Sequence, residues 1–267
     1  EEEAFPYESW KRSAELGFTG LPYPETYAGG GGSWLSFVIV LEELARVDCA
    51  VANSLMANSS VASLLANYGT EPQKQAFLRP ILDGSRIGSI GLTEPNAGSD
   101  AANIATKAEQ DGDHWIISGA KTFISNSGTD VTGPVVIAAV TGTKSDGRKE
   151  ISNFIVPAGT PGFTTGRKLT KIGWRASSTC ELHFDRCKIP AANLLGTRGH
   201  GLRQTLAQIS TGRILIGALG LGILQGSLDR SRNYMKERTA FGKPIADFQS
   251  LQFKLADMAT HAHAARL

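Results

Sequence analysis

The chain has 267 residues, of which 41% are hydrophobic and 19% charged, and this balance predicts a soluble globular protein with one sizeable core or two smaller ones. Its 27 basic and 25 acidic residues are spread along the chain and leave a net charge of only +2, which disfavours binding to nucleic acid or to a membrane surface. Three cysteines without metal-ligand spacing (Cys49, Cys180 and Cys187) argue against a disulfide framework and against a metal site.

These cysteines fit a reducing compartment, so we expect a cytoplasmic protein if the source is bacterial and a mitochondrial matrix protein if it is eukaryotic. The chain begins with Glu1, Glu2 and Glu3 and shows no apolar signal region. It also has no uninterrupted run of about 18 apolar residues, so no membrane-spanning segment is expected.

Residues 1–85 are predicted to form an N-terminal helical domain. The segment Trp34 to Val47 is apolar almost all round its first two turns, which is typical of a helix buried between others. Thr70 and Gln73 have the spacing of a capping box, with Pro72 in the first turn of the helix that follows. We expect that helix to end at Gly84.

Residues 86–198 are predicted to form a middle β domain. Short β-rich runs at 135–141, 153–156 and 181–184 are separated by Gly, Asp, Asn and Pro. The Asp111-Gly112 pair, which precedes a run of apolar residues, predicts a hairpin between two strands.

Residues 199–267 return to a helical pattern. A long packed helix is expected from about Gly201, and a second helix from about Asp247 to Leu267, where the pattern stops without a Gly or Pro signal, so we expect a longer parent protein. Because helices, strands and helices follow one another without β-α-β alternation, the fold class is α+β. The apolar stripe of the long helix consists of Ile214, Gly217, Ala218, Leu221, Leu224, Leu228, Ser231 and Met235.

Three of the glycines within the predicted long helix, Gly220, Gly222 and Gly226, form part of a dinucleotide-binding pattern, but they lie inside a helix and not after a strand. Close packing of two helices explains them better. His261 and His263 lie two residues apart on a predicted helix, so they point to different faces and cannot share a metal ion.

The segment Gly91 to Asp100, with the sequence GLTEPNAGSD, combines small residues with hydroxyl groups after a predicted strand. Small residues let the backbone approach a ligand closely, and free amides and hydroxyls can then bind the polar edge of a ring. On spacing alone, a β-turn with an Asx cap is the favoured interpretation.

This decapeptide resembles the first signature of the acyl-CoA dehydrogenase family. Three further segments, at 24–27, 172–179 and 237–242, resemble later motifs of that family in the same order, and the short-chain members are the most similar. The resemblance implies an N-terminal helical domain, a middle β domain of the orthogonal sandwich or barrel-like kind, and a C-terminal four-helix bundle, incomplete here. It also implies FAD, bound between the β domain and a neighbouring subunit's bundle in a homotetramer or dimer.

The resemblance further implies which residues contact the flavin. Thr93 would place its hydroxyl near the pyrimidine edge, and Ser125 would reach the reactive nitrogen N5. Phe123, Ile124 and Ser125 stand where the family usually has Trp-Ile-Thr. The remaining implied contacts of the same loop are Gly91, Leu92, Gly98 and Ser99.

Arg238 resembles the residue that crosses to the FAD pyrophosphate of a partner subunit, where a guanidinium suits two phosphate oxygens. Phe241 and Gln249 would complete that site. Without the resemblance, a solvated charge near a helix end is the simpler interpretation of Arg238.

The substrate would contact Ser99 and the segment Ser210, Thr211, Gly212 and Arg213. Ser210 departs from the Asp that close relatives often have, which leaves open a thioester carrier other than free CoA. Met56 would lie near the end of the acyl pocket, although core packing is the commoner role of a buried Met.

Removal of the α-proton requires a carboxylate. In the family this is a Glu in the C-terminal part, beyond Leu267 here, or a Glu immediately before the residue matching Arg213, which is Gly212 in this chain. Glu94 is expected to be structural. A complete chain of this length would therefore bind flavin poorly and not dehydrogenate, whereas a longer parent, which we favour, would be an ordinary enzyme.

The function that follows from the resemblance is FAD-dependent α,β-dehydrogenation of an acyl-CoA in fatty-acid metabolism, with electron-transfer flavoprotein as the acceptor. An oxidase or flavin monooxygenase on the same fold is the alternative among enzymes. A catalytically inactive scaffold without a base is the alternative of another class.

Overall fold

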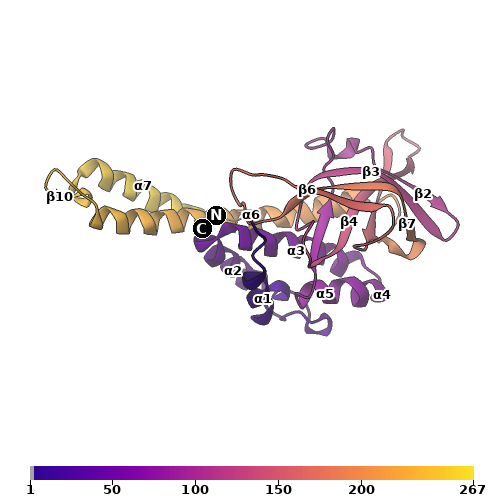
Figure 1. The fold of residues 1–267 in the computed structure, drawn as a ribbon, viewed down its shortest axis with the longest axis horizontal. Helices are drawn as coiled ribbons and strands as arrows, with labels where there is room; N and C mark the ends of the chain where they lie inside the picture. The colour runs from indigo at the N-terminus through magenta and orange to yellow at the C-terminus, as the bar shows by residue number, and fades with distance from the viewer. Residues whose placement is uncertain (1–2) are drawn as a thin grey trace.

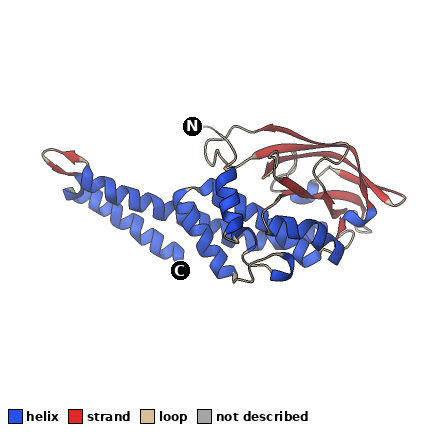
Figure 2. Cartoon of the chain, turned by 60° about the horizontal axis from the view of Figure 1, so that its bottom comes forward, coloured by secondary structure: helices blue, strands red, loops and turns tan. Residues whose placement is uncertain are grey.

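The computed structural model describes residues 3–267 as a helical layer beneath a β-rich body, with a long helical hairpin extending from both (Figure 1). The long helix starts beside the β strands and runs past the N-terminal helices into the extension, as the second view also shows (Figure 2). The N-terminal helices are α1 (Tyr7–Glu15), α2 (Trp34–Val47), α3 (Cys49–Tyr68), α4 (Glu71–Gln73) and α5 (Arg79–Leu82).

Helix α2 has the predicted bounds but not the predicted burial. Ser33 caps its first turn by accepting a hydrogen bond from the Ser36 N–H at 3.0 Å. Phe37 and Leu41 are buried, whereas Leu35 is 68% exposed. The expectation of a helix buried all round was therefore wrong, because α2 packs one stripe against α3 and α6 and leaves the other face open.

The predicted capping box at the start of α4 is confirmed. The Thr70 N–H donates to Gln73 Oε1 at 2.9 Å, and the Gln73 N–H donates to Thr70 Oγ1 at 3.4 Å. The Gln73 side chain also donates to the carbonyl groups of Ala192 and Leu194, which ties the helical layer to the β domain. A π-helical segment, Lys74–Leu78, leads into α5, and Gly84 follows its end with a φ of 77°.

The β domain contains one eight-stranded sheet with the order β6-β7-β3-β2-β4-β5-β8 and with β1 parallel to β4. The predicted hairpin is confirmed, because β2 and β3 pair antiparallel and Asp111 faces His114 across the turn. The strands are β1 (Ile87–Gly91), β2 (Lys107–Asp111), β3 (His114–Ser125), β4 (Thr132–Thr143), β5 (Lys149–Val156), β6 (Phe163–Lys168), β7 (Thr179–Pro190) and β8 (Leu194–Leu195).

The sheet has two halves, and the core of the β domain is shared between them. The pairing of β2 with β4 rests on Lys107 and Val140, so β1-β4-β5-β8 can fold over β6-β7-β3-β2. Buried side chains from both halves form one cluster. In it, Trp115 of β3 and Phe154 of β5 pack edge to face with their ring centroids 5.0 Å apart. This arrangement is the sandwich-like β domain expected from the sequence.

Helix α6 (Gly201–Glu237) is followed by the short strands β9 (Thr239–Ala240) and β10 (Lys243–Pro244), after which the chain turns back as helix α7 (Gln249–Arg266). A Cβ atom on Gly222 would lie 2.3 Å from the Glu42 carbonyl oxygen, and one on Gly226 would lie 2.3 Å from the Arg46 carbonyl oxygen. Close helix packing is thus confirmed for Gly222 and Gly226 but is wrong for Gly220, where a Cβ would meet nothing within 4 Å.

The buried stripe of α6 differs in part from the predicted one. Ala218, Leu221 and Met235 are buried as expected, but Ile214 is exposed while its neighbour Leu215 is buried. The stripe shifts because different elements cover successive parts of the helix: α3, β4 and β5 contact it as well as α2 and α7.

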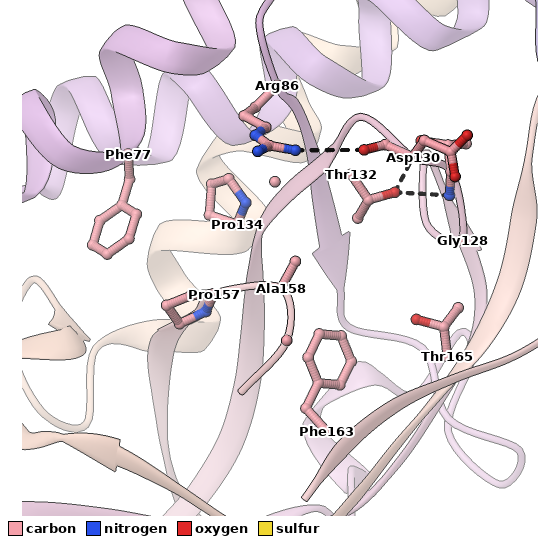
Figure 3. A pocket seen from close by; sticks show the side chains of 13 residues that line it. Phe77, Arg86, Gly128, Asp130, Thr132, Pro134, Pro157, Ala158, Phe163 and Thr165 are labelled. Carbon is pink, nitrogen blue, oxygen red and sulfur yellow. Dashed lines mark hydrogen bonds between the residues drawn. The ribbon is translucent and has the colours of Figure 1, made fainter. Parts of the chain in front are cut away.

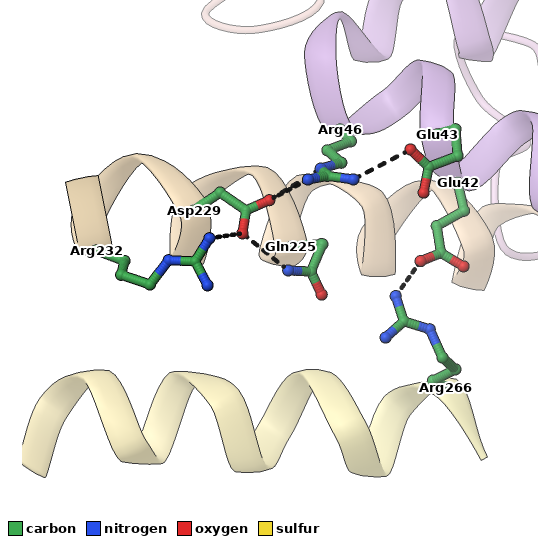
Figure 4. A network of polar contacts seen from close by, with 7 residues as sticks. All are labelled: Glu42, Glu43, Arg46, Gln225, Asp229, Arg232 and Arg266. Atoms are coloured by element: carbon green, nitrogen blue, oxygen red, sulfur yellow. Dashed lines mark hydrogen bonds and ion pairs between the residues drawn. The ribbon is translucent and has the colours of Figure 1, made fainter.

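Charged side chains join α2 to both helices of the hairpin (Figure 4). Arg46 of α2 donates to Asp229 of α6 at 2.7 Å, and Asp229 also faces Arg232. Glu42 of α2 forms an ion pair with Arg266 of α7. These contacts add to the close packing at Gly222 in fixing the direction of α6.

Helices α3 and α6 are long and apolar enough, by length and composition, to cross a membrane. The buried core helix of a folded domain passes the same test. In α3, 67% of the apolar window is buried inside the protein, and the helix packs against α2, α6 and β1. These contacts favour a core helix, and the expectation that the chain binds no membrane stays a prediction.

Candidate functional site

A buried ion pair holds the loop that follows β1. The Glu94 carboxylate accepts a hydrogen bond from Lys121 Nζ at 2.7 Å. It also accepts from the backbone N–H groups of Ala105 at 2.6 Å and Thr106 at 3.0 Å. Lys121 donates in addition to the Leu92 carbonyl at 3.2 Å, and its side chain has no exposed surface. The pair therefore fixes the loop against β3.

The ionisation of Glu94 follows from these contacts. Burial raises the pKa of Glu94, but the hydrogen bonds that it accepts, first from Lys121, outweigh this effect and leave the pKa below its usual 4.5. Burial lowers the pKa of Lys121, and Glu94 opposes that shift. A carboxylate that is buried and saturated with donors in this way is a structural anchor, as expected for Glu94, and not a free base.

A bulge in β3 brings the second predicted segment to the same loop. The pairing of β3 with β7 shifts register between Lys121 and Ile124, and Phe123 has a φ of +60°. Such bulges redirect side chains and are common beside functional sites. The Thr122 N–H donates to the Thr93 carbonyl at 2.9 Å, which joins the bulge to the loop.

Thr93 and Ser125 line one cavity of about 390 Å³, so the convergence on which the sequence-based hypothesis depends is present. Among residues 3–267, neither hydroxyl has a hydrogen-bond partner, which leaves both able to donate to a ligand. The other lining residues are Asn53, Met56, Ala57, Ser60, Ile90, Leu92, Phe123, Ile124, Thr205, Gln208, Ile209, Gly212, Arg213 and Ile216.

Helices α3 and α6 supply the walls opposite the loop. Met56 of α3 lines the cavity, and its role near the end of an acyl pocket stays a prediction. Asn53 lies one turn earlier, also lines the cavity, and donates from Nδ2 to Ser177 Oγ at 3.0 Å. The predicted motif at 172–179 therefore holds the position of a cavity-lining side chain. Gly212 and Arg213 of α6 line it as well, and a Cβ on Gly212 would meet only Gln208 Nε2, at 3.7 Å.

Several residues predicted to contact ligands lie outside this cavity. Gly91 is buried in β1, where a Cβ would meet Ile137 at 3.0 Å and the Lys121 side chain at 3.2 Å, so it serves the packing of the ion pair. Gly98 and Ser99 are exposed beyond the cavity wall. Their roles as ligand contacts stay predictions without support from the cavity.

The predicted substrate segment of α6 is divided by the helical period. Ser210 is exposed and donates to the Leu206 carbonyl at 3.1 Å. Thr211 faces a different cavity, whereas Gly212 and Arg213 face the one that contains Thr93. Residues in one turn of a helix point in different directions, so the four do not line a single cavity, and their role as substrate contacts stays a prediction.

The residues predicted for a neighbouring subunit's cofactor lie at the far tip of the hairpin. Arg238, Phe241 and Gln249 are exposed, and the tip is remote from the β domain (Figure 1). They do not line the cavity of their own chain, which is the placement that a role in another subunit requires. That role stays a prediction.

Two residues that shape the site are not among those predicted from the sequence. Lys121 lies in a strand between Ala120 and Thr122, and only the need of Glu94 for a buried cation could have pointed to it. Gln208 lines the cavity from α6, and nothing in its sequence neighbourhood distinguishes it from a solvent-facing helix residue.

A different cavity, of about 550 Å³, lies between the helical layer and the first residues of β4. Figure 3 shows Phe77, Pro134 and Phe163 around it, with Arg86 donating to the Asp130 carbonyl at 3.4 Å. None of the predicted site residues lines it, so its size alone does not make it the functional site. No cluster of His, Cys, Asp or Glu suited to a metal ion occurs within residues 3–267.

Comparisons with known proteins agree with this geometry. Models of the acyl-CoA dehydrogenase N-terminal, middle and C-terminal domains match residues 1–85, 89–187 and 199–267. A short-chain-specific acyl-CoA dehydrogenase of Clostridium acetobutylicum is 42% identical over 267 residues, which is 100% of this chain and 70% of that protein.

Two solved structures are similar throughout the chain. The butyryl-CoA dehydrogenase of Megasphaera elsdenii superposes with a TM-score of 0.93 at 41% identity, covering 99% of this chain and 70% of that one. A chain from a structure described as the electron transferring flavoprotein of Acidaminococcus fermentans superposes with a TM-score of 0.94 at 41% identity, over 99% of this chain and 69% of that one.

Proposed function

This chain belongs to the acyl-CoA dehydrogenase family, and on that premise we propose that it introduces an α,β double bond into an acyl-CoA with FAD as its flavin. FAD bound in the Thr93–Ser125 cavity would supply the acceptor for the two electrons that leave the β-carbon as hydride. The observation that carries the proposal is that these hydroxyls, both without a partner among the described residues, line one cavity with Met56 and Arg213.

The residues at the cavity fit a flavin ring. Thr93 can donate to the ring edge on which negative charge develops, and Ser125 can donate beside N5. The ion pair of Glu94 and Lys121 fixes the loop of Thr93, and the bulge at Phe123 fixes the position of Ser125. These donors are thus in place before charge develops, so their hydrogen bonds cost little reorganisation.

The opposite wall fits an acyl group. Met56, Ala57, Ile209 and Ile216 present apolar surface to the cavity, and Arg213 adds a cation at the same wall. Abstraction of the α-proton needs a carboxylate, and none of the described residues that line the cavity carries one. Flavin binding, thioester binding and turnover therefore have to be measured separately.

The test begins with the flavin content of the purified protein and with anaerobic bleaching by butyryl-CoA. We expect bound flavin and, when a base is present, bleaching. Ser125→Ala should weaken FAD binding about threefold to tenfold, the value of one hydrogen bond, and Ser125→Thr should restore it. A protein that binds no flavin, or a Ser125→Ala variant that binds it unchanged, would overturn the proposal.

Gly212→Glu provides a gain-of-function test, because the cavity has room for a side chain at that position. If the unsubstituted chain, called the parent from here on, binds butyryl-CoA without bleaching, this variant should raise the bleaching rate by about 100-fold. That factor is the lower range for a positioned base. Gly212→Gln is the matched control and should not bleach. Hydrogen peroxide formed in air would identify instead the oxidase that the sequence left open.

We further propose electron-transfer flavoprotein as the electron acceptor and a homotetramer as the assembly. The structure described as the Acidaminococcus fermentans flavoprotein supports the first, and the remote tip with Arg238 supports the second. A cytoplasmic or mitochondrial matrix location is proposed from the unpaired thiols of Cys49, Cys180 and Cys187.

A further inference from the structure

The cavity that Thr211 faces, called the second cavity below, has a volume of about 520 Å³ and lies between α3, α6 and the loop 22–24. Its walls include Tyr23, Trp34 and Asn67. The Tyr23 hydroxyl is already bonded to the Ser59 carbonyl at 2.7 Å and to Ser63 Oγ at 2.9 Å, and Tyr23 is only 4% exposed. The ring surface of this wall therefore comes mainly from Trp34, which is 40% exposed. Elsewhere the lining is mixed, with Leu64 and Ala66 beside Asn67 and Thr211, so an apolar tail would pack chiefly against the Trp34 side.

The second cavity lies next to the Thr93–Ser125 cavity along α3, and the latter is called the flavin cavity below. Met56 and Ser60 line the flavin cavity, and Ser63 and Asn67, one and two turns further along the same face, line the second one. Together the cavities follow one helical stripe. A group entering beside Thr93 and extending along α3 would be directed toward the second cavity.

Gln208 of α6 is the residue that lines both cavities. Its side chain is half-buried and makes no hydrogen bond with any residue in the described range 3–267. Its amide nitrogen lies near the open space at Gly212. Since no hydrogen bond of the amide would be lost by substitution, a smaller residue here should remove a boundary without disturbing the fold.

We propose that Gln208 is the partition that sets how far an acyl tail extends along α3. With Gln208 in place, a short acyl group fills the flavin cavity and stops. Without it, the two cavities join and a longer tail reaches the wall of Tyr23 and Trp34. This assignment rests on the proposed acyl-CoA dehydrogenase function and names a residue that determines its chain-length preference.

The experiment measures binding without turnover. Butyl-CoA and octyl-CoA thioethers lack the carbonyl that acidifies the α-proton, so calorimetry with the FAD-loaded protein reports affinity alone. The parent should bind octyl-CoA no more tightly than butyl-CoA. Gln208→Ala should favour octyl-CoA by about fourfold for each methylene that the second cavity buries, and by at least about tenfold in total.

Two variants make the result specific. Gln208→Leu keeps the bulk and loses the amide, so it should retain the parent's preference. Gln225→Ala changes the same residue type further along α6, away from both cavities, and should also retain it. An unchanged preference in Gln208→Ala, or an equal shift in Gln208→Leu, would overturn the partition.

The outcomes also separate this inference from the proposed function. If the parent binds both thioethers and is bleached by butyryl-CoA but Gln208→Ala behaves like it, only the partition is wrong. If the parent binds neither thioether and is not bleached by butyryl-CoA, the proposed function fails and the partition fails with it.

Discussion

The loop that carries Thr93 and the tip that carries Arg238 lie in opposite surroundings. At the loop, Glu94 and Lys121 are buried and satisfy each other within the chain. At the tip, Phe241 is 95% exposed, yet its backbone is fixed at a φ of +52° between two short paired strands.

The difference indicates whether the side chains of each region interact within their own chain or with another molecule. The loop is held in place by its own chain, so it can present donors to a ligand without rearranging. The tip is shaped by its own chain, with Phe241 and Phe248 edge to face at 6.1 Å, but its side chains face outward. We infer that the loop works within one subunit and that the tip serves a neighbour.

Breaking the ion pair should have the largest effect. Lys121→Met leaves the Glu94 carboxylate buried without its cation, and we expect the free energy of unfolding to fall by about 3–5 kcal/mol. Urea denaturation measures it. Lys107→Met, at an exposed position of the neighbouring strand, is the matched control and should stay within about 0.5 kcal/mol. Similar losses in both variants would contradict the anchoring role of Lys121.

The same pair predicts a dependence on pH. Because the folded pKa of Glu94 is below its usual 4.5, its ionised form stabilises the fold above that value, and the stabilisation is lost as the pH falls through the lowered folded pKa. Stability measured from neutral pH into the acid range should therefore fall less steeply in Lys121→Met than in the parent.

The junction between body and hairpin should give the next largest effect. Gly222→Ala places a methyl group 2.3 Å from the Glu42 carbonyl oxygen, and we expect a loss of about 1–3 kcal/mol by overpacking. Gly220→Ala, two residues earlier on the same helix, meets nothing within 4 Å and should stabilise by up to about 1 kcal/mol. Thermal unfolding of both variants tests this opposition in sign, and equal shifts would exclude close packing as the role of Gly222.

Features decided by a few neighbouring residues could be predicted from the sequence. The capping box at Thr70, the hairpin at Gly112 and the bounds of α2 depend on local hydrogen bonds and periodicity. The family resemblance added Thr93 and Ser125, which do share a cavity.

What covers a given face could not be predicted, because periodicity identifies an apolar stripe without identifying its neighbour. Leu35 was expected to be buried and is exposed, and the stripe of α6 shifts to Leu215. The sequence around Gln208 does not distinguish it from a solvent-facing helix residue, because its position between two cavities depends on the packing of α3 against α6. For the same reason, Ser210 and Thr211 could not be separated from Arg213 before the orientation of α6 was known.

Arg238→Ala should have the smallest effect on stability and the clearest effect on the cofactor. Because Arg238 is exposed, the free energy of unfolding of the cofactor-free protein should change by less than about 0.5 kcal/mol. If the guanidinium binds the pyrophosphate of a neighbour's FAD, its loss removes a charge-assisted hydrogen bond and should weaken FAD binding by about 10-fold to 100-fold. Arg230→Ala, at an exposed position of α6 about two turns before Arg238, should leave the flavin-to-protein absorbance ratio unchanged. Equal flavin content in both variants would show that the tip does not contact the cofactor, and the contrast between loop and tip would then be one of exposure alone.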